Sequence, residues 1–479
     1  MMKFRSSLIA LAALAAIGSA NALTPAEVVA ARGDGSLKEI RIAGASALRL
    51  AIGGFIQADL AQPGTLDVFF NDATGASHRA YSFKLKDPVG TWPAGTPILV
   101  TKRDAGGSGQ GVGPLIAVDA TQTHMKVDGA CTVAAGGVSP ATDIQKPGFL
   151  CSATVAALAD AGLSDVEPAL LEATINAGAG RNVANLDSEG FVQNIFGVAV
   201  NKKLYLALQK AQSLVDASAT VVDEDAAKQP SLPIPFVRGA LTGQLLGNDA
   251  TTKKGWNLVV PTSVDAAVNS KKINVCRRVA GSGTQAASNA YFANNPCGGA
   301  DIYAPANAGG SISATGALGV VAGSGTGNVE TCLGTTAENA SGGAYALGVI
   351  GRENNPRPMV NGVQQDKGYR FVKLSGVAPE RANVINGSYE FVVESTMQWT
   401  KSGANAPTGD KLTFLKLLRS NMGKATVLAG LDVDFQAGLA ASPSTIVGAW
   451  ADLPPAVQAF TSHSARKAAA SCTPVRMSK

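Results

Sequence analysis

Four segments spread along the chain repeat one local pattern, in which a strand-like run ends in a turn of small residues with a hydroxyl and a helix-like run follows. These segments are residues 42–47, 103–111, 162–168 and 276–285. A chain in which strands alternate with helices folds into layers of sheet and helix. The pattern therefore predicts the α/β fold class. Hydrophobic residues make up 46% of the chain and charged residues 16%, which excludes wholesale disorder and a highly charged coiled coil.

Hydrophobic spacing places individual elements between and around these turns. A period of two predicts strands at residues 39–43 and 97–101, and a strand that ends at residues 274–276. A period near 3.6 predicts helices at residues 45–60, 203–214 and 414–431, the last broken by Gly423. Residues 294–343 are rich in Gly, Ala, Asn and Ser, so we expect a long loop there.

The four turns carry groups that bind anions. A helix N-terminus presents unpaired backbone N–H groups and a partial positive charge, and glycine lets an anion approach the backbone closely. Hydroxyls add donors, and arginine adds a two-pronged donor that suits phosphate or carboxylate. The fourth turn is the most specific, because Arg278 precedes a Gly-Ser-Gly-Thr sequence at residues 281–284. The alternative for each turn taken alone is an ordinary helix cap.

The N-terminus has the features of a secretory signal peptide. Lys3 and Arg5 precede an apolar run over residues 8–17, and an Ala-x-Ala pattern ends at Ala22. We expect cleavage after Ala22, so that residues 1–22 are the signal peptide. The alternative is a membrane anchor, but the apolar run is shorter than the roughly 20 residues that span a bilayer. The chain is thus expected to be exported from a bacterial cell, to the periplasm or the extracellular space.

The six cysteines indicate disulfides, because their number is even and the chain is expected to be exported. The pairing is open on sequence grounds, and the best candidate pair is Cys131 with Cys151, which are close and bracket a Gly/Pro/Ser-containing stretch. No Cys-x-x-Cys sequence occurs, and the only histidines, His78, His124 and His463, are far apart. We therefore expect no metal site and no cofactor.

Several classes of function lack their sequence signals. The formal net charge of +5 is weak and scattered, which argues against nucleic-acid binding. Neither a Walker A sequence nor a Gly-x-Ser-x-Gly nucleophile elbow is present. No paired acid and base are visible, so we expect no catalytic residues and a protein that is not an enzyme.

Taken in order, the turns and their surroundings resemble a known family. Residues 44–46 (Gly-Ala-Ser), 106–109 (Gly-Gly-Ser-Gly), 164–165 (Ser-Asp) and Arg278 with 281–284 resemble the binding loops of periplasmic phosphate-binding proteins of ABC transporters. These proteins are class II periplasmic binding proteins. Further matches follow in the family's order at residues 241–256, 346–349, 372–377, 387–390 and 414–415. The chain is similar to a divergent member along nearly all of its mature length.

The resemblance implies an architecture of two α/β lobes joined by two crossover hinge strands. The crossovers would lie near residues 196–201 and 389–393. The first lobe would comprise residues 23–200 and 386–479, and the second residues 201–385. A ligand would bind in the cleft between them, and we expect a monomer.

The resemblance also implies which residues contact the ligand. Donors would be Ser46 and the N–H of Ala47 from the first helix, and Ser108 from the second loop. Arg278 would supply the charged fork. Asp165 would discriminate between ligands, because its carboxylate accepts a hydrogen bond from protonated phosphate but repels sulfate. The remaining donors would be Ser282, Gly283 and Thr284.

The sequence departs from the family in three places. Ala280 stands where the family has an aspartate that holds the arginine. The stretch from Ser108 to Asp165 is longer than usual and carries Cys131 and Cys151, and residues 294–343 are expanded. The leading expectation is capture of inorganic phosphate for an ABC importer, with its permease as partner. Two alternatives stay open: another oxyanion or small carboxylate as ligand, or a surface or matrix protein that reuses the fold without transport.

Overall fold

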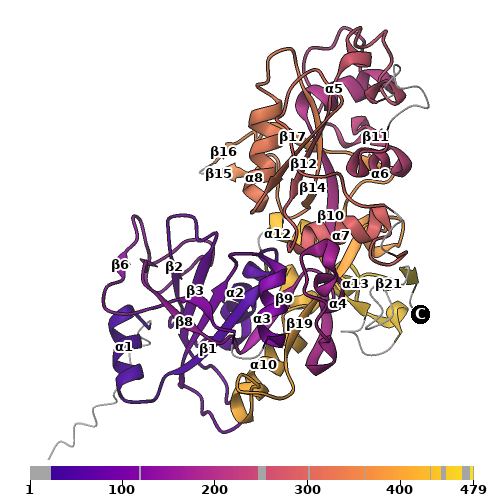
Figure 1. Cartoon of the computed structure of the whole chain (residues 1–479). Helices are drawn as coiled ribbons and strands as arrows, with labels where there is room; N and C mark the ends of the chain where they lie inside the picture. The colour runs from indigo at the N-terminus through magenta and orange to yellow at the C-terminus, as the bar shows by residue number, and fades with distance from the viewer. Residues whose placement is uncertain are drawn as a thin grey trace, which may run out of the picture.

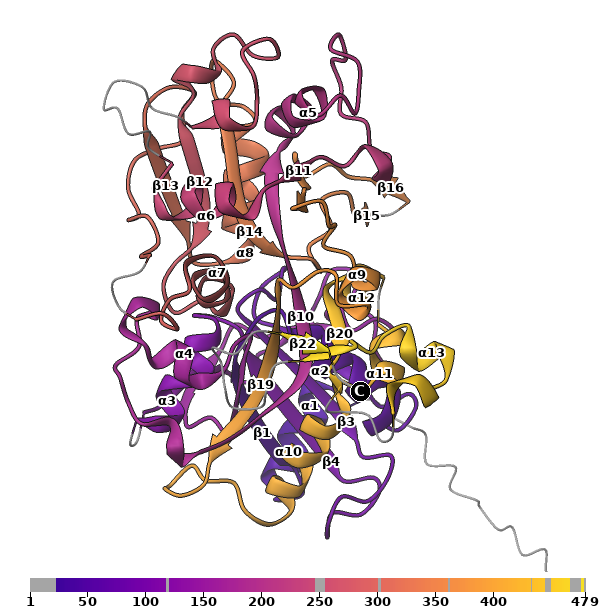
Figure 2. The same cartoon turned by 90° about the vertical axis from the view of Figure 1, so that its right-hand side faces the viewer.

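A computed structural model describes residues 23–117, 120–245, 255–299, 303–360, 362–431, 433–443, 449–465 and 475–477. The expected signal peptide, residues 1–22, lies outside these residues. Figures 1 and 2 show a mixed α/β chain arranged as two bodies. We call the one that holds β1, β4, β9 and β19 the lower body, and the one that holds β12, β13 and β14 the upper body, after their places in Figure 2.

The sheet of the lower body contains the first strands of the chain. β1 (Lys38–Gly44) pairs in parallel with β4 (Pro97–Arg103) on one side and with β9 (Ala161–Ser164) on the other. Antiparallel strands extend it on both sides. They are β3 (His78–Lys84), β2 (Asp67–Phe70) and β19 (Val392–Thr400).

The sheet of the upper body is built around β12 (Ile273–Arg278). β12 pairs in parallel with β13 (Leu318–Gly323) and with β14 (Tyr345–Gly351). Every residue of β14 is buried, as expected for a strand that is covered on both faces.

One long strand, β10 (Leu186–Asn201), takes part in both sheets. Its residues 186–195 pair with β19 in the lower body, and its residues 196–200 pair with β14 in the upper body. Its last residues also pair with β17 (Tyr369–Phe371). Figure 2 shows β10 running from one body into the other. The expected lobe boundaries and the role of the crossings as hinges stay predictions.

Helices cover the sheets of both bodies. They are α1 (Pro25–Gly33), α2 (Arg49–Phe55), α3 (Gly113–Ile116), α4 (Pro168–Glu172), α5 (Lys202–Ala211), α6 (Ile234–Thr242), α7 (Gly283–Ala293), α8 (Thr326–Thr331), α9 (Arg381–Ile385), α10 (Gly409–Asn421), α11 (Ala425–Ala429), α12 (Val433–Gly438) and α13 (Pro455–Gln458). The short strands are β5 (Gln122–Met125), β6 (Thr132–Val133), β7 (Phe149–Leu150), β8 (Thr154–Ala157), β11 (Ser231–Leu232), β15 (Met359–Val360), β16 (Val363–Gln364), β18 (Lys373–Leu374), β20 (Leu439–Ala441), β21 (Ser464–Ala465) and β22 (Arg476–Met477). Within the described residues, none of these helices is both long and apolar enough to cross a bilayer.

The expected strands at 39–43, 97–101 and 274–276 are confirmed as parts of β1, β4 and β12. The helix expected at 45–60 begins only at Arg49 and continues as a π-helix over Ile56–Leu60. It begins late because the backbone before it packs on the end of β9: Gly44 has φ 114°, and the N–H of Ala45 donates to the carbonyl of Leu163 at 2.9 Å.

The expected break at Gly423 is confirmed, since α10 and α11 flank it. A Cβ atom on residue 423 would lie 1.8 Å from the carbonyl oxygen of Phe191, so only glycine fits against β10 there. The helix expected at 203–214 is confirmed with a slightly earlier span, as α5.

The expectation of one long loop over residues 294–343 is wrong in its second half. That stretch contains β13, α8 and a π-helical turn, Cys332–Ala337. β13 is fixed by pairing with β12, which the composition does not reveal. The start of α8 is fixed by the Asn328 side chain, whose Oδ1 accepts from the N–H of Gly325 at 2.9 Å.

Two disulfides join described cysteines. The predicted pair Cys131–Cys151 is present, with the Cα atoms 4.4 Å apart. A second bond that the sequence did not single out joins Cys276 in β12 to Cys332 directly after α8, with the Cα atoms 5.8 Å apart. Cys297 is disulfide-bonded as well. The first bond therefore closes a loop in the lower body, and the second joins the residue after α8 to β12 in the upper body.

Candidate functional site

The second predicted loop lies directly after β4. Gly106 and Gly107 have φ values of 82° and 66°, which turn the chain back so that Ser108 starts a short 3-10 helix, Ser108–Gly111. Ser108 is fully buried. The N–H of Gly109 donates to the carbonyl of Gly281 at 2.9 Å, so this loop of the lower body touches the fourth loop, in the upper body.

Asp165 follows β9 and is held by two other elements of the lower body. Its backbone N–H donates to the Ser108 hydroxyl oxygen at 3.1 Å, and the Ser108 hydroxyl lies 3.2 Å from its Oδ2. Its Oδ1 accepts from Nδ2 of Asn194 in β10 at 3.2 Å. The carboxylate is therefore fixed in position by side chains that are far apart in the sequence.

The fourth predicted loop joins β12 to α7 and faces this carboxylate. Ser282 is the N-cap residue of α7, and Gly283 and Thr284 are its first two residues. A Cβ atom on residue 283 would lie 2.3 Å from Oγ of Ser108 and 2.6 Å from Oδ2 of Asp165. The start of α7 is thus pressed against these two side chains, which brings together donors from both bodies at a helix N-terminus. In Figures 1 and 2, α7 lies where the bodies meet.

Arg278, the last residue of β12, is buried beside the second loop. A Cβ atom on Gly107 would lie 3.7 Å from Nη2 of Arg278. The two Nη atoms donate to neutral acceptors: Nη2 to the carbonyl oxygen of Ser324 at 2.8 Å, and Nη1 to Oγ1 of Thr326 at 3.1 Å. Among the described residues, no carboxylate oxygen lies within 4.0 Å of the Arg278 guanidinium, so Arg278 forms no ion pair with them.

Burial controls the electrostatics of the site. It raises the pKa of Asp165 to about 6, although the positive charge of Arg278 and the Ser108 hydroxyl oppose the shift. Burial also lowers the pKa of Arg278, and the charges of Asp165 and Glu353 oppose that shift. Nearby, Lys102 is fully enclosed and forms an ion pair with Asp104 at 2.6 Å. The carboxyl of Glu353 has a pKa raised to about 7, mainly by burial.

Buried polar atoms without a partner remain at the site. Nε of Arg278 and Oγ of Ser282 are both buried and make no hydrogen bond to the described residues. Buried donors are nearly always satisfied in folded proteins, so these two donors next to a helix N-terminus are suited to hydrogen-bond an anion. No set of three or more metal-ligating side chains occurs among the described residues.

Of the predicted site residues, the structure gathers Ser108, Asp165, Arg278, Ser282, Gly283 and Thr284 around the start of α7. Ser46 and Ala47 are different. They lie in a turn before α2 instead of in its first turn, since Arg49 begins that helix. Neither residue hydrogen-bonds to Ser108, Asp165 or Arg278 in the described part of the chain.

Four contributors were missed by sequence reasoning: Asn194, Glu353, Ser324 and Thr326. Asn194 directly follows another amide, Gln193, inside a long strand, and no local signal distinguishes it. Ser324 and Thr326 did have a signal, because residues 321–326 repeat residues 279–284 letter for letter, as Val-Ala-Gly-Ser-Gly-Thr. That repeat was hidden inside the stretch expected to be a loop.

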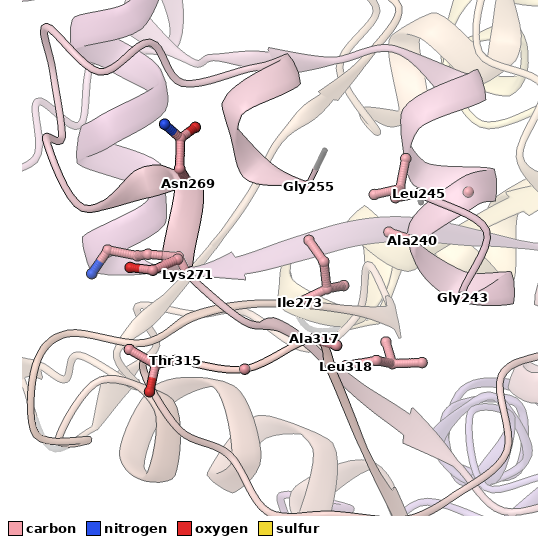
Figure 3. A pocket seen from close by; sticks show the side chains of 13 residues that line it. Ala240, Gly243, Leu245, Gly255, Asn269, Lys271, Ile273, Thr315, Ala317 and Leu318 are labelled. Carbon is pink, nitrogen blue, oxygen red and sulfur yellow. The ribbon is translucent and has the colours of Figure 1, made fainter. Parts of the chain in front are cut away.

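A separate pocket of about 350 Å³ lies in the upper body, between α6 and the β12–β13 edge (Figure 3). It shares no lining residue with the site at α7, and its walls are mostly glycine, alanine and leucine. Its one charged side chain, Lys271, donates to the carbonyl of Gly342 at 3.1 Å. Two of its lining residues, Leu245 and Gly255, stand on either side of residues 246–254 in the sequence, which are outside the described part. We therefore place the candidate site at α7.

No protein-family model matches the chain, and no curated protein matches it. The solved structures to which its structure is similar include the following three. A substrate-binding protein from Clostridium perfringens, assigned to phosphate ABC transport and solved with bound phosphate, is 12% identical with a TM-score of 0.39, over 84% of this chain and 98% of that one. An ABC-type phosphate transport receptor from Vibrio cholerae is 14% identical with a TM-score of 0.31, over 57% and 78%. PstS from Borrelia burgdorferi is 11% identical with a TM-score of 0.33, over 84% and 98%. Values this low do not assign the chain to a family.

Proposed function

We propose that this chain captures a tetrahedral oxyanion, inorganic phosphate foremost, between its two bodies and carries out no chemistry on it. The observation that carries the proposal is the convergence of Arg278, Ser108 and the start of α7 around one buried carboxylate, Asp165. Arginine, a hydroxyl and a helix N-terminus are the groups that proteins use to bind phosphate.

The charge of each group determines the role that we assign to it in binding the anion. Arg278 and the first-turn N–H groups of α7 stabilise the negative oxygens of the ligand. The orphaned donors, Nε of Arg278 and Oγ of Ser282, gain partners when the anion binds. Asp165 accepts a hydrogen bond from the protonated oxygen of phosphate, and its charge repels sulfate, which has no proton to give near neutral pH.

We further propose that the chain acts outside the cytoplasm, where its disulfides are stable, and delivers the anion to the permease of an ABC importer. Closure of the two bodies around the ligand would signal occupancy to that partner. Two other functions stay open as outcomes of the test: capture of a different oxyanion or a small carboxylate, and a surface or matrix role without a ligand.

The test is calorimetric titration of the ligand-stripped mature protein with phosphate, and with sulfate as the control anion. We expect phosphate binding without sulfate binding in the wild type, and at least a hundredfold loss in Arg278→Ala, because a desolvated charged contact is worth several kcal/mol. Arg277→Ala is the matched control, since Arg277 points to the opposite face of β12. Asp165→Asn should admit sulfate.

The other outcomes separate the alternatives. Binding of oxalate or another oxyanion in place of phosphate would keep the site but change the ligand. No heat and no thermal shift with any of these anions would contradict the proposal and favour the surface role. An equal loss of phosphate affinity in Arg278→Ala and Arg277→Ala would show that the site lies elsewhere.

A further inference from the structure

The hexapeptide Val-Ala-Gly-Ser-Gly-Thr occurs twice in the chain, and each copy joins a strand of the upper body to the helix that follows it. Residues 279–284 follow β12 and open α7, and residues 321–326 end β13 and open α8. β12 and β13 are parallel neighbours, with Arg278 opposite Gly323. The two turns therefore emerge side by side at the same edge of the sheet.

The copies have different tasks. The first copy presents Ser282, Gly283 and Thr284 at the start of α7, as described above. The second copy is turned toward Arg278: its Ser324 carbonyl accepts from Nη2 at 2.8 Å, and its Thr326 hydroxyl accepts from Nη1 at 3.1 Å. One copy thus lies at the anion site, and the other holds the arginine that serves it.

Three contacts hold the second copy in place, in addition to the pairing of β13 with β12. The N–H of Val279 donates to the carbonyl of Gly323 at 3.0 Å, next to the turn. The Asn328 side chain fixes Gly325 through the hydrogen bond at the start of α8. The Cys276–Cys332 disulfide joins β12, two residues before Arg278, to the residue that follows α8. The acceptors for Arg278 are therefore fixed relative to the strand that carries it.

We propose that this second copy, residues 321–326, is the positioning element for Arg278, with Thr326 as the side chain that orients the guanidinium. The proposal rests on the proposed anion-binding function. Both acceptors are neutral, so they orient the guanidinium without cancelling its charge. A carboxylate partner would orient the arginine equally well but would repel the anion.

The test compares three variants by calorimetric titration with phosphate. Thr326→Val keeps the shape and removes the acceptor, so we expect about a tenfold weaker phosphate affinity, in line with the loss of a hydrogen bond to a charged group. Thr326→Ser restores the hydroxyl and should bind within about twofold of the wild type. Thr331→Val, the same change on an exposed residue of α8, is the matched control.

Crystal structures of the wild type and Thr326→Val in one crystal form give a readout that does not depend on the ligand. In the wild type we expect the Arg278 guanidinium to hydrogen-bond to Ser324 and Thr326, and in the variant we expect it to be displaced. If the wild type binds no oxyanion but Arg278 moves in this way, the proposed function fails and the positioning role stands. Unchanged affinity together with an unmoved Arg278 would overturn the inference.

The disulfide provides an independent arm. Replacing Cys276 and Cys332 by alanine should weaken phosphate binding several-fold, because α8 loses its covalent tie to the strand of Arg278. Replacing Cys131 and Cys151 by alanine is the matched control, since that bond lies in the lower body, away from β12 and α8, and should affect stability alone. Equal phosphate affinities for the two double variants, measured on folded protein, would count against the positioning element.

Discussion

At the scale of single residues, the site depends on how little space surrounds its polar groups. Gly283 has no room for a side chain because Ser108 and Asp165 occupy the place of a Cβ atom. Asp165 in turn is buried and hydrogen-bonded from two sides. Position and titration of this one carboxylate are therefore both open to direct test.

Gly283→Ala should weaken phosphate binding by about tenfold or more, because the new methyl group would displace Ser108 and Asp165 by overpacking. The control is Gly327→Ala, where nothing lies within 4 Å of the added Cβ atom. The measurement is phosphate titration, with urea unfolding of both variants to verify that they fold. An unaltered affinity in Gly283→Ala would show that the contact at the start of α7 is not part of the site.

Asp165 should make the ligand-free protein less stable as the pH rises from about 4 to about 6. The folded pKa is about 6, above the value of 3.8 for a free aspartate, so the folded state holds the proton more tightly. The stabilisation is complete at low pH and is lost as the pH rises through the folded value; the two values correspond to about 3 kcal/mol. Urea unfolding at several pH values should show that the free energy of unfolding falls less with rising pH in Asp165→Asn than in the wild type. If it falls equally in both proteins, the raised pKa of Asp165 is contradicted.

At the scale of elements, the local pattern predicted what local sequence determines. Strands β1, β4 and β12 have alternating or apolar sequences of their own, and the glycine-hydroxyl turns after them are where they were expected. β13 and α8 were missed because Gly and Asn, which are abundant in this stretch, are weak formers of both structures, and pairing with β12 decides the outcome. The helix start at Arg49 was missed because contact with β9, and not helix propensity, sets it.

Gly423→Ala should destabilise the fold by about 2–4 kcal/mol, because the added carbon would overlap the Phe191 carbonyl and force α10 and α11 away from β10. Gly33→Ala, at the end of α1 with nothing within 4 Å of its Cβ position, is the control and should change little. Unfolding in urea measures both. A difference below about 0.5 kcal/mol between the two variants would show that the helix break tolerates a side chain.

At the scale of the whole molecule, the candidate site exists only because distant segments meet. Ser108 and Asp165 come from the lower body and Arg278 and α7 from the upper body, and β10 belongs to both sheets. The resemblance supplied the site residues one by one, but single positions could not show that Asn194 or Thr326 hold them in place. Such supports depend on three-dimensional proximity, which a short sequence window does not contain.

The repeated hexapeptide has one more consequence, for how this sequence can vary. A turn of six residues offers amide hydrogens on one side and oxygens on the other, so the same hexapeptide can donate hydrogen bonds in one place and accept them in another. Here the copy at 279–284 opens the helix at the proposed anion site, and the copy at 321–326 accepts hydrogen bonds from the Arg278 guanidinium. Substitutions in the two copies should therefore be under unlike constraints. Small residues matter in the first, while an oxygen at position 326 matters in the second.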